Sequence, residues 1–253
     1  MVKRINRMKK LSQFMAMSRF MLAHIHHNHI ADNYQMIQPY FTGKHGLEIG
    51  GLSNVFSRVG SFPVYRTAAR VDNCNILPTR YRLLYRVPGD NYLLDGTTLG
   101  SLHNGYDFVI SSHTFEHIAN PLKALFQWKN IIRTGGVVFI VCPHKDFTLD
   151  HRRPLTTMEH LIDDWMRDTT EYDTTHFEEI DRLTDRSGLV GNSPGYAVKE
   201  SVDKGLVNNH MRILHHHTFV PELMEEIFKW ADLDIVYLKR IEPEHIAIAG
   251  VKR

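Results

Sequence analysis

The sequence predicts an α/β fold built on an open, mostly parallel seven-stranded sheet with an antiparallel last strand. Two apolar runs predict buried central strands, "YDFVISS" at 106–112 and the β-branched "VVFIVCP" at 137–143. The amphipathic stretch 120–134 between them predicts a crossover helix that ends at a glycine pair. The last two predicted strands, 233–240 and 244–253, are joined only by a short "IEPE" link, so we expect them to be antiparallel.

The other elements follow in chain order. A helix is expected from about residue 7 to residue 40, and the short apolar run "HGLEIG" at 45–50 predicts the first strand. Ser53 then has the position of the N-cap of a short helix. Second and third strands are expected at 64–72 and 91–96. We therefore divide the chain into an N-terminal helical segment (1–42), a core (43–143), an insertion after strand five (144–217) and a C-terminal helix–strand–strand unit that completes the sheet (218–253).

The composition excludes several classes of protein. The chain has 253 residues and a formal charge of +2, so no strong positive field indicates nucleic acid as a partner. No apolar run reaches the roughly 18 residues of a membrane span. Cys74 and Cys142 are isolated, which indicates a reducing cytoplasm. The basic start of the first helix allows packing on the domain, packing on a partner subunit in a homodimer, or weak contact with an anionic membrane surface.

The segment 144–217 breaks the alternation of strands and helices. It is polar and holds many of the seventeen histidines of the chain. About 70 residues are too many for a structureless connection inside a domain. Because open α/β sheets bind their ligands at the carboxyl ends of the strands, we expect this segment to be a substrate-binding insertion.

The turn after the first strand reads "LEIGGLS" and raises the question of which nucleotide it binds. It lacks the G-x-G-x-x-G spacing of a dinucleotide site, so a nicotinamide cofactor is disfavoured. A carboxylate at the strand end, Glu48, suits a cationic ligand such as a sulfonium, although loop amides could also satisfy it. Asp72 and Asp95 follow the next two expected strands, where carboxylates can receive the ribose hydroxyls and the adenine amino group of a cofactor.

Taken in order, "LEIGG", "VDN", "LLDG", "YDFVISSHTFEHI" and "RTGGVVFIVCPH" resemble the successive motifs of class I S-adenosylmethionine-dependent methyltransferases. The resemblance covers residues 44–143 well and the C-terminal unit more loosely, and it departs at Leu52, where the family usually has glycine. It implies a Rossmann-like sheet and S-adenosylmethionine as cofactor. The residues implied to bind this cofactor are Glu48, Gly50, Gly51, Ser53, Asp72, Asn73, Asp95, Gly96, Ser112 and His113.

A narrower set of motifs resembles a bacterial methyltransferase group associated with surface-polysaccharide gene clusters. These motifs include "SSHTFEHIANPLKAL", "DHRRPLTTMEHLIDDW", "DTTHFEEI" and "ILHHHTF". This resemblance implies a small acceptor, a hydroxyl of a sugar-derived or phosphorylated precursor of a surface glycan. Nothing in the composition indicates such an acceptor independently.

Candidates for the chemistry lie where strand ends meet the insertion. A hydroxyl acceptor benefits from a base, and a carboxylate that orients an imidazole makes a better one. In "DHRR" we expect Asp150 to orient His151, and two arginines can hold a phosphate. "EH" at 116–117 can instead be structural. The expected catalytic residues are His144, Asp150, His151 and His117, and the expected substrate-binding residues are Arg152, Arg153, His176, Arg212 and His216.

Several alternatives stay open at the level of sequence. The acceptor can be a small-molecule amine, or the chain can be an inactive protein that keeps the cofactor. Two further hypotheses are that the chain is a nicotinamide oxidoreductase or a histidine-rich metallohydrolase. Carboxylates and imidazoles of the insertion could bind a divalent ion. We nevertheless expect no metal, because no segment shows a tight ligand spacing, and we expect neutral histidines in a polar substrate pocket.

Overall fold

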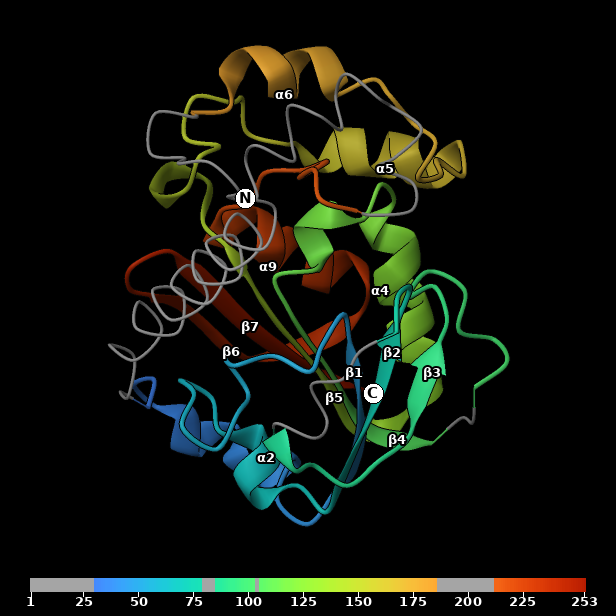
Figure 1. Cartoon of the computed structure of the whole chain (residues 1–253), viewed down its shortest axis with the longest axis vertical. Helices are drawn as coiled ribbons and strands as arrows, with labels where there is room; N and C mark the ends of the chain where they lie inside the picture. The colour runs from blue at the N-terminus through green and yellow to red at the C-terminus, as the bar shows by residue number, and fades with distance from the viewer. Residues whose placement is uncertain (1–29, 79–84, 103–104, 186–211) are drawn as a thin grey trace, which may run out of the picture.

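The computed structural model describes residues 30–78, 85–102, 105–185 and 212–253. A sheet of seven strands runs through the molecule in the order β3-β2-β1-β4-β5-β7-β6 (Figure 1). The first five strands are parallel, whereas β7 runs antiparallel to both β5 and β6. This confirms the predicted fold class. The strands are β1 His45–Ile49, β2 Arg70–Asn75, β3 Asn91–Leu93, β4 Tyr106–Ser112, β5 Ile132–Pro143, β6 Leu233–Ile241 and β7 His245–Lys252.

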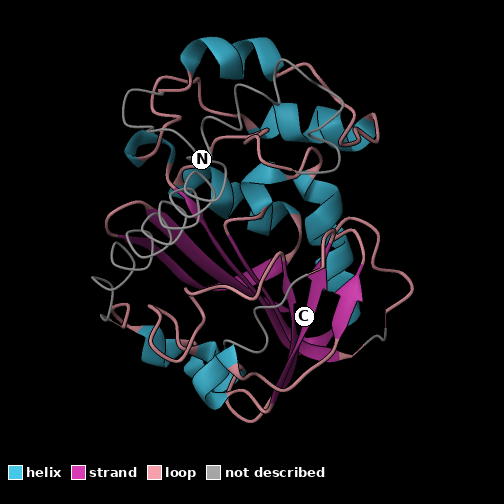
Figure 2. Ribbon diagram, viewed as in Figure 1, coloured by secondary structure: helices cyan, strands magenta, loops and turns pink. Residues whose placement is uncertain are grey.

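Helices cover both faces of the sheet, with further helices above its carboxyl edge (Figure 2). Helices α4 and α9 pack on one face, and α2 with two short 3-10 turns packs on the other. Helices α5 and α6 lie in the predicted insertion, at the top of Figure 1. The helices are α2 Val64–Thr67, α4 Pro121–Ile131, α5 Met158–Met166, α6 Phe177–Leu183 and α9 Pro221–Trp230, with 3-10 turns η1 Tyr34–Met36, η2 Gln38–Tyr40, η3 Phe115–His117 and η4 Lys145–Phe147.

The two faces of the sheet explain the unbroken apolar runs of β4 and β5. Side chains alternate along a strand, so Val138 and Ile140 enter the core against α4 and α9, while Val137 and Phe139 enter the core on the other face. A strand covered on both faces needs apolar residues at every position. The two central strands could be recognised from the sequence for this reason.

Three expected elements differ in the structure. The stretch expected as strand from 64 begins as helix α2, and β2 starts only at Arg70, where it enters register with His45 of β1. No α-helix forms in the described stretch 50–63, so Ser53 is not a helix N-cap. Residues 30–40 form turns η1 and η2 rather than the end of a long helix, whose expected start lies outside the described residues.

The predicted end of the crossover helix is also wrong. Helix α4 ends at Ile131, and Ile132 already pairs with Tyr106 of β4. The register then shifts, because Phe108 pairs with Val137. The glycine pair therefore lies in an irregular stretch of β5 instead of closing the helix. Among the described residues, no helix has the length and apolar character that a membrane crossing requires.

Phe139→Ala should lower the free energy of unfolding by about 3–5 kcal/mol, since large aromatic truncations in a packed core leave a cavity. Phe139 is fully buried and its ring centroid lies 4.9 Å from that of Phe62 and 5.6 Å from that of Phe56. The matched control is Phe126→Ala, because Phe126 is 44% exposed. Guanidinium unfolding of both variants checks this, and equal losses would contradict the assigned core.

Candidate functional site

A cavity of about 250 Å³ opens where β1, β2 and β4 end, the edge at which open α/β sheets bind ligands. Its wall combines apolar side chains with a few polar groups, as in small-molecule sites generally. The lining residues are Ile49, Gly50, Cys74, Asn75, Ile76, Leu77, Leu94, Gly96, His113, Thr114, His117, Ile118 and Arg212.

The turn after β1 shapes one side of this cavity. Gly50 has φ +78°, and a Cβ there would overlap the side chain of Thr114, so glycine is required. The Glu48 carboxylate is fully buried, and it accepts hydrogen bonds from the Ser53 amide at 3.0 Å and from the Tyr65 hydroxyl. Glu48 therefore holds the loop, as the alternative interpretation of the sequence proposed. Gly51 lies against Glu48, and neither residue lines the cavity.

The structure places Asp72 away from the cavity, and its expected contact with ribose stays a prediction. Asp72 lies three positions before the end of β2 and is 1% exposed. Its carboxylate contacts His45 Nε2 at 2.9 Å, Arg70 at 2.9 Å and the Tyr106 hydroxyl at 3.1 Å. Burial alone would raise the pKa of Asp72, but the hydrogen bonds it accepts lower it. Asp72 thus forms an ion pair with Arg70 and does not line the cavity. The neighbouring Asn73 is fully buried and does not line the cavity either.

Asn75 occupies the strand end that Asp72 was expected to occupy. It is the last residue of β2 and lines the cavity. Its amide nitrogen donates to the Gly51 carbonyl and to Asn73 Oδ1, which fixes the orientation of the side chain. The sequence did not reveal this residue, because the start of β2 was misplaced. The pairing of Cys74 with Ile49, the last residue of β1, shows that β2 continues to Asn75, and this register is known only from the structure.

Asp95 follows β3, as predicted, but its carboxylate is already paired. Arg212 donates to it through both terminal nitrogens, one of them at 3.2 Å, and the Thr97 amide donates at 2.8 Å. Burial opposes ionisation of Asp95, yet these donors lower its pKa. Arg212 was expected on the substrate side and instead lines the cavity beside Gly96.

The end of β4 brings two histidines to the cavity. His113 lines it and lies 3.1 Å, Nε2 to Nδ1, from His245. His117 also lines it, and its Nδ1 donates to the Leu214 carbonyl at 3.1 Å. Because a carbonyl only accepts, Nδ1 carries the hydrogen and Nε2 carries the lone pair. Ser112 is buried beside them but does not line the cavity.

Four ionisable residues meet next to the cavity, and we call Glu116, His117, His215 and Asp150 the acceptor cluster. One donor atom each of Glu116, His117 and His215 lies within 4.8 Å of the other two. Glu116 is 1% exposed, and both carboxylate oxygens lack a hydrogen-bond partner in the structure. Burial raises the pKa of Glu116 to about 7 and lowers that of His117 well below its ordinary value.

Asp150 orients a histidine, but not the expected one. Its carboxylate lies 2.5 Å from His215 Nδ1, whereas His151 is turned toward the Thr148 carbonyl and is 40% exposed at its side chain. Burial alone would lower the pKa of His215, but the hydrogen bond to Asp150 raises it. His144 packs on Phe147 and accepts from the Asp146 amide. Neither His144 nor His151 lines the cavity, so the structure gives no support to the base roles expected for them.

The two arginines of "DHRR" diverge. Arg153 is 2% exposed and donates to Asp150, to Glu179 at 2.8 Å and to the backbone carbonyls of His215 and His216. Arg152 is exposed and pairs with Asp185 at 2.9 Å. The arginines therefore do not converge on a phosphate. Arg153 instead connects separate parts of the insertion.

His176 and His216, the other expected substrate ligands, do not reach the cavity. His176 Nε2 lies 3.0 Å from His160 Nε2. His216 is 1% exposed, with Nε2 3.8 Å from Glu171, and burial lowers its pKa to about 4. Both are neutral at pH 7 on these grounds. The sequence could not show which histidines face the cofactor and which are packed behind it.

A family profile described as a methyltransferase domain matches residues 21–237, most of the chain. The chain belongs to this methyltransferase-domain family. It is an S-adenosylmethionine-dependent methyltransferase, and S-adenosylmethionine is its cofactor. A search of curated proteins found no match.

Solved structures share the fold of this methyltransferase at low sequence identity. The protein described as a methyltransferase in complex with the Trm112 activator of Haloferax volcanii is 12% identical, with TM-score 0.54, 93% of this chain and 94% of that chain covered. A protein from Rhodobacter sphaeroides described as a zinc-dependent alcohol dehydrogenase is 15% identical, with TM-score 0.54 and coverage of 89% and 92%. A methyltransferase from Aquifex aeolicus is 9% identical, with TM-score 0.48 and coverage of 88% and 91%.

Arg153→Met should lower the free energy of unfolding by about 3–5 kcal/mol, because it removes the donor of two carboxylates and two backbone carbonyls in a buried network. Arg152→Met is the matched control and should change stability by less than about 1 kcal/mol, since this ion pair is exposed. Denaturant unfolding measures both. Equal, small effects would show that Arg153 is not a structural connection.

Proposed function

We propose that this enzyme methylates a hydroxyl group of a small, sugar-derived acceptor, with His117 as the base. The observation that carries the proposal is the unprotonated Nε2 of His117 at the cavity wall, set by the Nδ1 hydrogen bond to Leu214. A neutral hydroxyl is a poor nucleophile and needs such a base, whereas a phosphoryl oxygen does not. The arginines of "DHRR" are engaged with protein partners, so they give no support to a phosphate on the acceptor.

The cavity fits the cofactor by the chemistry of its wall. Ile76, Leu77 and Ile118 offer apolar surface for an adenine ring, and Asn75 offers an amide oxygen to ribose hydroxyls. Gly50 keeps the approach to the turn open. When bound, S-adenosylmethionine supplies an electrophilic methyl group on a sulfonium. The residues of the chain then need to position the acceptor in line and remove its proton.

The acceptor cluster supports this proton transfer. His117 is neutral at pH 7 because burial lowers its pKa, so Nε2 can take a proton from the hydroxyl as the C–O bond forms. The Glu116 carboxyl group, 3.7 Å from that nitrogen, can stabilise the imidazolium that results. His215, paired with Asp150, places a further donor beside Glu116. An amine acceptor would need no base, and it stays the second candidate.

The association with surface glycans rests on the resemblance of the insertion motifs. Its test is a screen in which the purified enzyme and isotopically methyl-labelled S-adenosylmethionine are incubated with nucleotide sugars, free sugars and matched amino sugars. Label on a hydroxyl of a sugar supports the proposal. Label only on amino groups would replace it with N-methylation.

Asn75→Ala should raise the dissociation constant for S-adenosylmethionine about tenfold, as expected for losing roughly 1.4 kcal/mol of hydrogen bonding. Asp72→Asn should leave this constant within about twofold while lowering stability, because Asp72 lies beneath the site. Calorimetric titration of the two variants separates the assignments. A larger loss of affinity in Asp72→Asn would restore the role first expected for Asp72.

His117→Asn should lower kcat by about 10²–10⁴-fold with cofactor affinity unchanged. Asparagine can keep the donor to the Leu214 carbonyl while removing Nε2. The control is His151→Asn, which alters an exposed histidine and should retain wild-type kcat. Steady-state kinetics with an acceptor found in the screen gives the result, and full activity of His117→Asn would exclude it as the base.

A further inference from the structure

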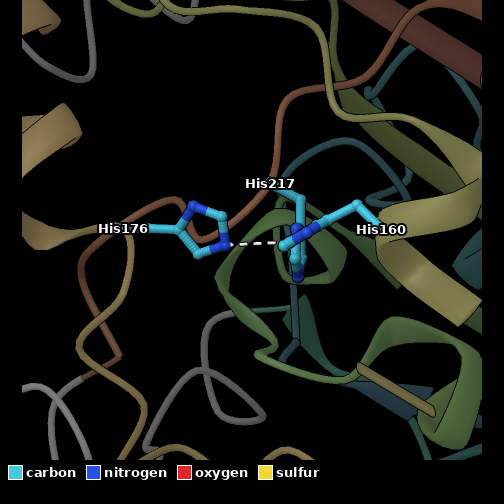
Figure 3. Close-up of side chains that lie close together, drawn as sticks. All are labelled: His160, His176 and His217. Carbon is cyan, nitrogen blue, oxygen red and sulfur yellow. Dashed lines mark hydrogen bonds between the residues drawn. The ribbon is translucent and has the colours of Figure 1, made fainter. Parts of the chain in front are cut away.

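Three histidines outside the acceptor cluster converge on one point. His160 comes from α5, His176 precedes α6, and His217 comes from the segment before α9. Figure 3 shows the three rings turned toward one another. One ring nitrogen of each lies within 4.8 Å of the other two. Three parts of the insertion, distant in sequence, thus place imidazoles together.

The distances agree with a tetrahedral coordination shell. Zinc–nitrogen bonds of about 2.0–2.1 Å place neighbouring donor atoms about 3.3–3.4 Å apart. His160 Nε2 lies 3.0 Å from His176 Nε2. The carboxylate of Asp164, one turn along α5, has Oδ2 3.3 Å from His160 Nε2.

Two buried atoms at this point lack a hydrogen-bond partner in the structure, His217 Nδ1 and Asp164 Oδ2. The side chain of His217 is 1% exposed and that of Asp164 is 9% exposed. Nε2 of His217 donates to the Ala119 carbonyl at 3.1 Å, so Nδ1 carries a lone pair. A histidine that donates one ring nitrogen to a carbonyl is the usual second-shell arrangement of a metal ligand.

We propose that His160, His176 and His217 bind a divalent transition-metal ion of the zinc type, with the Asp164 carboxylate beside the site as an outer-shell group. Three imidazoles form a donor set suited to such an ion, which can keep a fourth position for water. The ion would join α5, the start of α6 and the segment that carries His215. It would thereby brace the acceptor cluster without taking part in methyl transfer. The competing arrangement is a hydrogen-bonded set of neutral imidazoles without metal.

The test uses the full chain purified without a polyhistidine tag, stripped with chelator and then titrated with Zn²⁺ against a chromogenic competitor. We expect about one zinc per chain with a submicromolar dissociation constant. His176→Ala and His160→Ala should weaken binding by more than 100-fold, and Asp164→Asn by about 10–100-fold. The matched control, His151→Ala, removes an exposed histidine and should bind zinc as the wild type does.

A folded wild-type chain that takes up no zinc would overturn the proposal. Unchanged binding in His176→Ala would overturn it as well. Loss of zinc in His117→Ala, with binding retained in His176→Ala, would assign the ion to the acceptor cluster instead. His176→Gln provides a second variant should the alanine change unfold the chain. Because the readout is metal content, its failure is distinct from a failure of methyl transfer.

Discussion

The buried guanidinium of Arg153 is the interaction on which the acceptor side of the site depends. It joins Asp150 and Glu179 to the backbone carbonyls of His215 and His216, so one cation connects three stretches of the insertion. Removing a cation from such a position leaves several buried acceptors unsatisfied. The orientation of His215 toward Glu116 follows from this network, because Asp150 holds the imidazole while Arg153 holds both the carboxylate and the chain.

The site therefore has two parts with different physical origins. The cofactor cavity is made by the ends of β1, β2 and β4, whose positions are fixed by strand register and by the packed core on each face. The acceptor cluster joins Glu116 and His117 from turn η3, after β4, to Asp150 and His215 from the insertion. The elements of the insertion bury few apolar side chains of their own. Polar networks and, by our proposal, a metal ion stabilise the insertion, whereas hydrophobic packing stabilises the sheet. A variant fold of the insertion could thus alter the acceptor while leaving the cofactor cavity in place.

The sheet could be predicted from the sequence, but the contacts between side chains distant in sequence could not. Strands β4 and β5 were identifiable because burial on both faces requires apolar residues throughout. The end of β2 was missed by three residues, because the apolar run from Val64 belongs to a helical turn. Because of this shift, Asp72 was predicted at the strand end, where the structure has Asn75 at the cavity wall. In "DHRR", adjacency in sequence suggested that Asp150 orients His151, whereas the fold brings His215 to Asp150 from 65 residues away.

The central claim is that S-adenosylmethionine occupies the cavity with its reacting end toward the acceptor cluster. A crystal structure with the product cofactor S-adenosylhomocysteine tests this most directly. The account predicts the ribose hydroxyls within hydrogen-bond distance of Asn75, the adenine against Ile76 and Ile118, and the sulfur facing His117. A ligand bound outside this cavity, or a ribose held by Asp72, would contradict it.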